Sequence, residues 1–435
     1  MSKISTYNCI LLVSSTLLLF SIPSYVVEAL IPTPRYNGGC ALLNQHIYCY
    51  GGTVNRQPST DHYVFDLSND FTIDSKTIDS WASAADSTNS YQLEPNSLFC
   101  MTALNDNTGY LIHGGLGYAS STQFLKNTTA IYNTTILSWQ PLQQQIMNQS
   151  QIISSREGSC TLDRINRLWI WGGIRSVRYT KHLYLNTLTW STLAKNTNAT
   201  TAIKPRLAHT ATLNEKTDQS IYYIGGLQND GEHLLPSPMN EILEYQIQND
   251  RWITHRSPLN TTVPSSRRLH TATWVPNSED LIFVFGGSVI DGSSTVADYS
   301  YLLNITSFEW TPVNLTNTAA TGAGSRFGHS AVLHKNNSLF ILFGADQLSN
   351  LRNDFFVIDM SHWQTVTDFK VNGEYALIPV NNNTSSAPSS TIVNNGASSS
   401  RTKITSLAAT STSTINMCFG LSFFSAILIS FLFKY

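Results

Sequence analysis

The chain has 435 residues, of which 12% are charged and 11% aromatic, and its formal net charge is −2. This balance excludes the basic footprint of a nucleic-acid-binding protein. The length supplies ample apolar material for a core, and the composition is that of a β-rich, nearly neutral protein.

Residues 1–29 have the form of a secretory signal peptide. Lys3 precedes the apolar run CILLVSSTLLLFSI (9–22), and Val27 and Ala29 hold the small-residue positions before the cleavage site. We expect cleavage after Ala29 and a mature chain that meets an oxidising compartment.

Residues 30–380 repeat one pattern, in which an apolar run ends at a diglycine and a later strand-like segment closes on a tryptophan. The diglycines lie 53 to 63 residues apart, with Gly344-Ala345 as a degenerate sixth: Gly51-Gly52, Gly114-Gly115, Gly172-Gly173, Gly225-Gly226 and Gly286-Gly287. The tryptophans in phase with them are Trp81, Trp139, Trp190, Trp252, Trp310 and Trp363. The glycines permit close backbone approach, and each tryptophan can fill the wedge between two repeats. Such a period indicates the four-stranded blades of a propeller.

Over about residues 32–380 this pattern resembles the kelch-repeat family, in the branch with secreted galactose-oxidase-type propellers. The resemblance implies an all-β, kelch-type β-propeller of six four-stranded blades, or of seven if residues 365–380 and the amino-terminal strand complete another. Galactose-oxidase relatives hold copper through two tyrosines and two histidines, with a Tyr-His pair at one ligand position. The chain has no such pair where the pattern requires it, so we expect no cofactor, no metal and no copper-radical chemistry.

An arginine opens the innermost strand of most predicted blades. Asn96 replaces it in blade two, and the arginines are Arg35, Arg156, Arg206, Arg267 and Arg326. One hypothesis places them around the channel mouth, where they bind an acidic sugar. The other pairs them with acids that open the outer strands, namely Asp61, Glu241, Asp298 and Asp354, and we favour this pairing. Three of the arginines precede a histidine by three residues, and we interpret His209, His270 and His329 as core residues satisfied by backbone groups rather than as metal ligands.

Four cysteines lie in the repeat region, and they permit three disulfide connectivities. If Asn44-Gln45 forms a two-residue hairpin turn, Cys40 lies opposite Cys49, which leaves Cys100 to pair with Cys160. Ten sequons predict N-glycosylation, which agrees with a secreted chain: Asn127, Asn133, Asn148, Asn198, Asn260, Asn304, Asn314, Asn336, Asn382 and Asn383.

The carboxy-terminal residues form a stalk and a tail. Residues 381–415 are rich in Ser, Thr and Asn and predict a disordered stalk, since they offer little apolar surface to offset the entropy of ordering. Residues 416–435 contain the apolar run MCFGLSFFSAILISFLF. This tail is interpreted as a glycolipid-anchor signal, with a plain membrane span as the alternative.

Together these features predict a cell-surface propeller that acts as a non-enzymatic binding or adhesion module for an extracellular protein or glycan. A carbohydrate-active surface enzyme, oxidase-like or epimerase-like, that uses the propeller channel is the alternative. No hydrolase, zinc or phosphate-binding motif favours the alternative. The sequence does not identify the ligand.

Overall fold

The computed structural model describes residues 30–87, 91–117, 125, 128–142, 155–174, 181–186, 189–192, 203–229, 233–316 and 323–377. The predicted signal peptide (1–29), stalk (381–415) and tail (416–435) lie outside these residues. Within the part that the structure describes, no helix is long and apolar enough to cross a membrane.

The described residues contain six four-stranded antiparallel sheets, which we call blades and number in chain order. Blade one consists of β1 (Gly39–Leu43), β2 (His46–Tyr50), β5 (His62–Asp66) and β7 (Ala82–Ser83). Blade two consists of β8 (Cys100–Ala103), β9 (Gly109–His113), β10 (Thr129–Asn133) and β11 (Ser138–Pro141). Blade three consists of β12 (Ser159–Leu162), β13 (Arg167–Trp171), β14 (Lys181–Tyr184) and β15 (Thr189–Thr192).

The remaining blades follow the same order from the innermost strand outward. Blade four consists of β17 (Thr210–Leu213), β18 (Ser220–Ile224), β21 (Glu241–Gln246) and β22 (Arg251–Arg256). Blade five consists of β23 (Thr271–Trp274), β24 (Leu281–Phe285), β25 (Ser300–Asn304) and β26 (Trp310–Pro312). Blade six consists of β27 (Ser330–His334), β28 (Ser338–Leu342), β29 (Phe355–Asp359) and β30 (Gln364–Val366).

Short elements decorate the blades. A hairpin joins β3 (Thr53–Val54) to β4 (Gln57–Pro58), and a three-stranded sheet joins β16 (Arg206–Leu207), β19 (Leu227–Asn229) and β20 (Leu234–Pro236). A 3-10 helix, η1 (Thr77–Ser80), lies between β6 (Phe71–Thr72) and β7. The last strand, β31 (Asp368–Phe369), pairs with β6.

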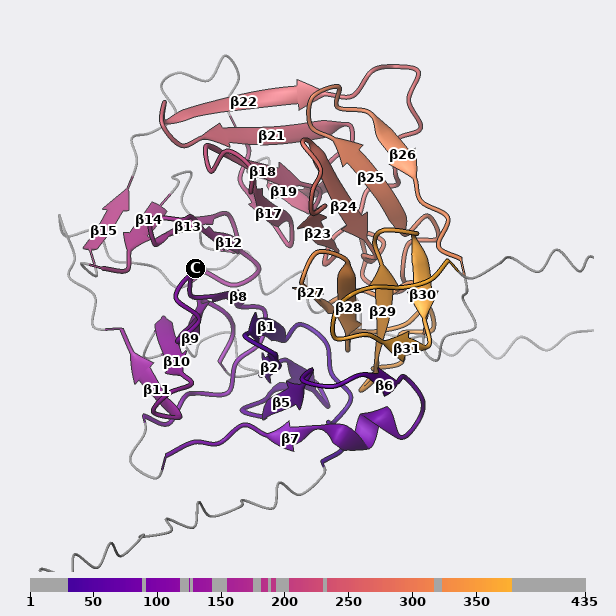
Figure 1. Cartoon of the computed structure of the whole chain (residues 1–435). Helices are drawn as coiled ribbons and strands as arrows, with labels where there is room; N and C mark the ends of the chain where they lie inside the picture. The colour runs from indigo at the N-terminus through magenta and orange to yellow at the C-terminus, as the bar shows by residue number, and fades with distance from the viewer. Residues whose placement is uncertain are drawn as a thin grey trace, which may run out of the picture. The chain divides into compact units, whose positions relative to one another are not determined.

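The innermost strands contact one another in a closed cycle, β1 to β8, β12, β17, β23, β27 and back to β1 (Figure 1). The predicted all-β propeller fold is therefore confirmed. Residues 365–377 do not form part of a seventh blade, which was the alternative that the sequence left open. β30 completes blade six, and β31 pairs with β6 beside blade one. The four strands of each blade come from one continuous segment of the chain. Contacts between blades one and six must therefore close the ring.

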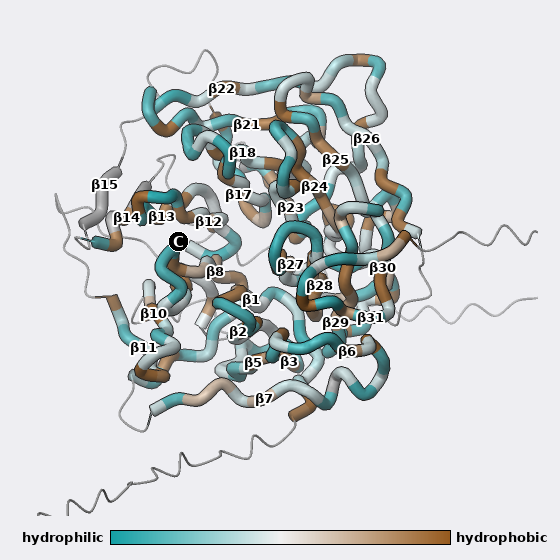
Figure 2. Tube along the Cα trace, in the orientation of Figure 1, coloured by the Kyte–Doolittle hydropathy of each residue, from teal (hydrophilic) through white to brown (hydrophobic). Residues whose placement is uncertain are grey.

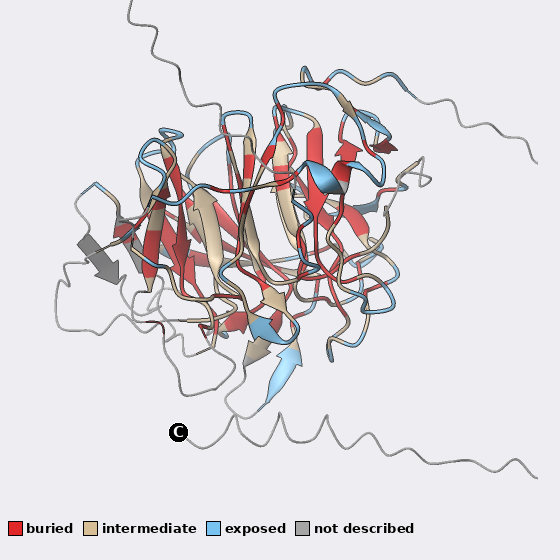
Figure 3. Cartoon of the chain, turned by 90° about the horizontal axis from the view of Figure 1, so that it is seen from below, coloured by how far each residue is buried: buried red, intermediate tan, exposed pale blue. Residues whose placement is uncertain are grey.

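Apolar side chains fill each of the six interfaces between neighbouring blades. Buried residues are concentrated in the strands, whereas most exposed residues lie in the turns and loops (Figure 3). Hydrophobic and hydrophilic stretches are both present along the strands (Figure 2). The tryptophans whose side chains are described pack on the preceding blade: Trp81 on Phe343, Trp139 on Tyr50, Trp252 on Trp171, Trp310 on Met239 and Trp363 on Phe283. Each such side chain removes on the order of 150–250 Å² from water, an upper estimate of about 4–6 kcal/mol.

The diglycines connect each blade to the next by the same hydrogen bond. The amide of the second glycine donates to a carbonyl at the start of the following blade, at 2.7 to 3.1 Å: Gly52 to Asn96, Gly115 to Ser155, Gly173 to Arg206, Gly226 to Arg267 and Gly287 to Arg326. The first glycine lies against that same carbonyl; a Cβ on Gly286 would meet the Arg326 oxygen at 2.1 Å. The glycines thus permit close approach between blades, rather than only between strands of one blade.

The sixth mark is shifted by one residue from its predicted place. The amide of Gly344 donates to the carbonyl of Arg35 at 2.9 Å, so Gly344 is the second member of its pair and Phe343 the first. Phe343 adopts the same left-handed backbone as the glycines, with φ of 59°. Its ring packs on Trp81 and beside Arg35 at the junction of blades six and one, where blade one carries Gly38 in place of the repeated histidine.

The described residues contain two disulfides, one within blade one and one between blades two and three. Cys40 is joined to Cys49 between β1 and β2, and Cys100 to Cys160 between the innermost strands of blades two and three. This is the connectivity that the sequence favoured. Asn44 turns the β1–β2 hairpin with φ of 56°, as its predicted turn requires.

The substitution Gly286→Ala should lower the free energy of unfolding by about 3 kcal/mol or more, since the new Cβ clashes with a neighbouring backbone and sits at positive φ. The control is Gly292→Ala, which also has positive φ but meets only the flexible end of Arg268. Its cost should be about 1–2 kcal/mol. Denaturant titration compares the two variants, and equal losses would contradict the role assigned to the diglycine.

Candidate functional site

Four of the five predicted ligand arginines are buried inside the blades. Arg35 is 2% exposed and Arg206, Arg267 and Arg326 are each 1% exposed. Their guanidinium groups pair with the four acids expected from the sequence: Arg35 with Asp61 at 2.5 Å, Arg206 with Glu241 at 2.8 Å, Arg267 with Asp298 at 3.0 Å and Arg326 with Asp354 at 2.9 Å. Burial lowers the pKa of Arg206 to about 10, which leaves it charged at neutral pH. The arrangement favours structural struts over an acidic-sugar site.

Arg156, the fifth, does not occupy the repeated arginine position. Ser155 does, because its carbonyl accepts the inter-blade bond from Gly115 and its hydroxyl donates to the carbonyl of Gly172 at 3.0 Å. Arg156 is therefore equivalent to Arg268, and both lie in isolated bridges at the blade edge. Arg156 follows the repeated position by one residue, so the prediction for blade three was wrong by one position.

The three repeated histidines are buried core residues, as predicted. His270 and His329 bond the backbone of Ile224 and of Arg326, and all three histidines also contact hydroxyl groups of the preceding blade. The Nε2 atoms of His209, His270 and His329 lie 2.7, 3.5 and 2.9 Å from hydroxyl oxygens of the preceding blade, those of Ser159, Thr210 and Thr271. Burial lowers the pKa of His270 and of His329 to about 3, so both rings are neutral at physiological pH. Among the described residues, no cluster of three or more His, Cys, Asp or Glu could hold a metal ion.

A second ring of backbone hydrogen bonds surrounds the channel. Each amide donates to the carbonyl of the equivalent residue in the preceding blade at 2.7 to 3.1 Å, and the cycle closes from Asn37 to Gly328. All six residues have φ between 52° and 61°, and we call them the mouth residues: Asn37, Leu98, Glu157, Ala208, Leu269 and Gly328. Sequence reasoning missed them because their conformation is shared but their residue types are not. The usable signal was position, two residues after the repeated arginine position.

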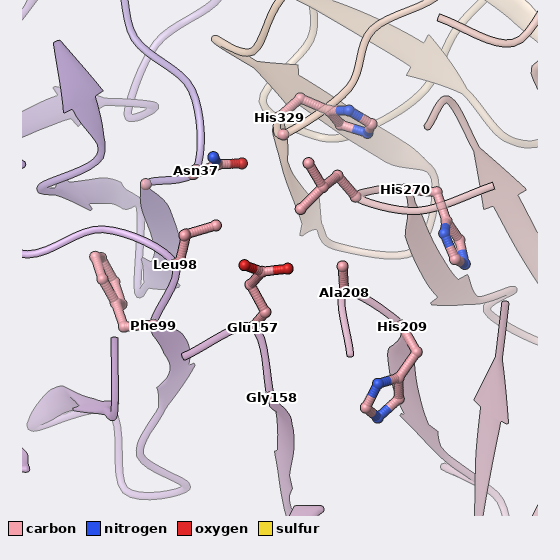
Figure 4. A pocket seen from close by; sticks show the side chains of 12 residues that line it. Asn37, Leu98, Phe99, Glu157, Gly158, Ala208, His209, His270 and His329 are labelled. Atoms are coloured by element: carbon pink, nitrogen blue, oxygen red, sulfur yellow. The ribbon is translucent and has the colours of Figure 1, made fainter. Parts of the chain in front are cut away.

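The mouth residues line a cavity of about 140 Å³, together with residues that follow them, including His209, His270 and His329 (Figure 4). This volume is below the roughly 300–1,000 Å³ of typical small-molecule pockets. The predicted ligand arginines Arg35, Arg156, Arg206, Arg267 and Arg326 are not among the lining residues. The cavity has room for one side chain of a ligand rather than for a sugar ring.

Among the described residues that line this cavity, Glu157 is the one carboxylic acid. Burial raises the pKa of its carboxyl above the usual range, and the positive charges of Arg156 and Arg268 oppose that shift. No hydrogen bond or ion pair joins this carboxyl to another described side chain. The buried side-chain oxygen of Asn37 likewise has no hydrogen-bond partner among the described residues.

The cavity opens toward the same end of the blades as the long loops. In each blade the second strand runs antiparallel to the first, so the loop after the diglycine begins beside the mouth residue. We call this end the loop face; its described loops include residues 51–61, 225–229, 233–240, 286–299 and 343–354. The turns between first and second strands lie at the opposite end.

A larger hollow of about 440 Å³ lies between blades one and two. Its polar groups are engaged with one another: Asp61 pairs with Arg35, Tyr63 donates to Asp61, and Tyr50 donates to the carbonyl of Glu94 at 2.9 Å. His62 contacts the hydroxyl of Tyr110, and burial lowers the pKa of this histidine to about 3. These mutual contacts engage the inner polar groups of the hollow, whose rim includes the exposed residues Thr60, Ser83 and Asp86.

The closed cycle of strands, the inter-blade diglycine bonds and the buried arginines define a repeat-built β-propeller with a small cavity at its channel mouth. A family model for the KLHDC2/KLHL20/DRC7 Kelch-repeats domain matches residues 101–319 and 217–407, which together make up more than half of the chain. The chain belongs to the kelch-repeat family, as predicted. Kelch propellers generally bind proteins, so its class is that of a protein-binding propeller module. No curated protein sequence matches the chain.

The substitution Arg267→Ala should cost about 3–5 kcal/mol of stability, because it removes the guanidinium that pairs with Oδ1 of Asp298 and donates to the carbonyls of Ser265 and Gly286. Arg156→Ala is the control, since Arg156 is half-buried and forms no ion pair with a described residue; it should cost about 1 kcal/mol or less. Thermal and denaturant unfolding measure both. A stable Arg267→Ala protein would overturn the strut interpretation.

Proposed function

We propose that the chain is an extracellular, surface-anchored kelch propeller that binds a protein ligand on its loop face. The carrying observation is that loops of three successive blades present large apolar side chains on this face. Leu234 and Leu235 belong to blade four, Ile290 to blade five and Leu348, which is 81% exposed, to blade six. Exposed apolar residues that gather on one face are typical of protein-interaction surfaces.

The loops that carry these residues are held in place. The hydroxyl of Ser349 donates to the carbonyl of Ser293 at 2.6 Å, which ties the loop of blade six to that of blade five. The β19–β20 hairpin is anchored by its pairing with β16 at the start of blade four. Ordered loops on a rigid scaffold bind with less entropic cost than loops that must order on contact.

Two features support an extracellular location. Disulfides persist in oxidising compartments, and the described residues contain two. Among the described sequons, Asn260, Asn314 and Asn336 are exposed, whereas Asn133 and Asn304 are half-buried and accept local backbone bonds. The other predicted sites, Asn127, Asn148, Asn198, Asn382 and Asn383, lie outside the described residues, as do the predicted signal peptide and anchor. Glycan binding, adhesion and carbohydrate-active chemistry have no specific support in the geometry.

The test uses cells that express the tagged full chain, stained without permeabilisation to establish surface display, and probed with a panel of purified extracellular proteins. For any protein bound, Leu348→Asp and Leu235→Asp should each weaken binding at least tenfold, because a charge then enters an apolar contact. Ile165→Asp is the matched control: Ile165 is 58% exposed but lies in the turn between β12 and β13 at the opposite end.

Two outcomes would contradict the proposal. One is binding that Ile165→Asp abolishes and the loop-face variants leave intact, which would move the interface to the other end of the blades. The other is a full chain that is produced by the cells but is not displayed on their surface. Loss of binding in a loop-face variant counts only if that variant reaches the surface at the level of the unsubstituted chain.

A further inference from the structure

Two unsatisfied hydrogen-bond acceptors converge on the cavity at the channel mouth. The Glu157 carboxylate points into the cavity from blade three, and the Asn37 amide points into it from blade one (Figure 4). The Asn37 oxygen is buried without a hydrogen-bond partner among the described residues. The Glu157 carboxyl forms no hydrogen bond or ion pair with a described residue. A buried acceptor without a donor costs about 1–3 kcal/mol, and this cost falls on the Asn37 oxygen. The Glu157 carboxyl is half-buried and stays accessible from the cavity that it lines. A donor brought by a ligand could therefore reach the cavity and pair with both groups.

The structure of the ring does not explain a glutamate at this position. Every mouth residue needs a left-handed backbone, which Gly328 and Asn37 adopt most readily. At the equivalent place, Glu157 adds a carboxyl with φ of 61° and a pKa raised by burial. Ala208 shows that a small side chain completes the ring equally well. Strained and desolvated polar groups of this kind gather at functional sites.

The lining of the cavity is part apolar and part polar. Leu98, Ala208 and Leu269 supply apolar surface, and the volume of the cavity is about 140 Å³. A lysine or arginine side chain combines an apolar stem with a charged, donor-rich head, which suits a cavity that offers both apolar surface and acceptors. A carboxylate ligand would bring like charge and further acceptors to Glu157.

We propose that the channel mouth receives a cationic side chain, lysine or arginine, from the protein bound on the loop face, and that Glu157 and Asn37 hold its charged head. This inference rests on the proposed function, since the loop face would present the protein that carries this side chain. The apolar stem then contacts Leu98, Ala208 and Leu269, and the head group provides the donors that Glu157 and Asn37 lack.

Other charged and titratable groups surround the mouth, and none of them neutralises Glu157 by direct contact. Arg156 and Arg268 do not line the cavity, and Arg268 extends toward Gly292 in the loop of blade five. The three lining histidines are neutral because burial lowers the pKa of each. A cation binds the ionised carboxylate, whose pKa is raised in the free protein, so affinity should increase as pH rises above the usual glutamate range.

The test uses the purified full chain and four probes: the acetylated, amidated tripeptides Gly-Lys-Gly, Gly-Arg-Gly, Gly-Gln-Gly and Gly-norleucine-Gly. Saturation-transfer NMR or calorimetry at several pH values measures binding. The lysine or the arginine probe should bind at least tenfold more tightly than the two neutral probes, and affinity should rise with pH. The arms with lysine and arginine identify which cation is preferred.

The variants isolate the two acceptors. Glu157→Gln should weaken the cationic probe at least tenfold and remove its pH dependence, and Asn37→Gly should weaken it several-fold while it preserves the left-handed backbone. Ile165→Asp is the control, because Ile165 lies at the opposite end of the blades and does not line the cavity, and this variant should bind as the unsubstituted chain does. Because Glu157→Gln removes a buried charge, its unfolding temperature should not fall, and this measurement excludes misfolding as the cause.

Equal binding of the norleucine probe, or a Glu157→Gln protein that keeps its affinity, would overturn the inference. The proposed function fails separately. If a protein ligand requires Leu348 but binds Glu157→Gln as tightly as the unsubstituted chain, the loop-face proposal stands and the cation proposal is wrong. If a cationic probe requires Glu157 but no protein binds the loop face, the cation site stands and the proposed function is wrong.

Discussion

One set of contacts determines the rest of the structure: the backbone hydrogen bonds that pass from each blade to the next. Two cycles of them run around the channel, one from the second glycine of each pair and one among the mouth residues. Both cycles cross the junction between blades six and one, through Gly344 to Arg35 and Asn37 to Gly328. Since the described strands of blades one and six all come from one end of the chain each, these bonds, the side-chain packing and the β6–β31 pair close the ring.

The mouth ring fixes positions more than it adds stability. Each non-glycine residue in the left-handed region costs roughly 1–2 kcal/mol, and each hydrogen bond contributes about 0.5–1.5 kcal/mol net. These magnitudes are similar, so the net stability of the ring must come from the apolar clusters between blades. What the ring provides is a rigid frame in which one side chain from each blade faces a common axis. Glu157 and Asn37 face the cavity because of that frame.

Much of this fold could be predicted from residue types that recur. Diglycines and tryptophans are rare enough to reveal a period, and the pairing of Arg35 with Asp61 and of Arg326 with Asp354 followed from charge complementarity at predicted strand starts. The alignment failed where a different residue takes over a role: Ser155 replaces the arginine in blade three, and Phe343 replaces a glycine in blade six. Side-chain identity could not reveal the mouth residues, because their common property is a backbone angle.

The proposed site requires a ring of mouth residues that is closed and rigid. Hydrogen exchange of the six mouth amides, read residue by residue, tests it directly. If the ring opens only when the propeller unfolds, Asn37, Leu98, Glu157, Ala208, Leu269 and Gly328 will exchange at one slow rate that tracks global stability. Markedly faster exchange at Asn37 and Gly328 than at Ala208 and Leu269 would show an open junction between blades one and six, and would contradict the closed frame on which the site rests.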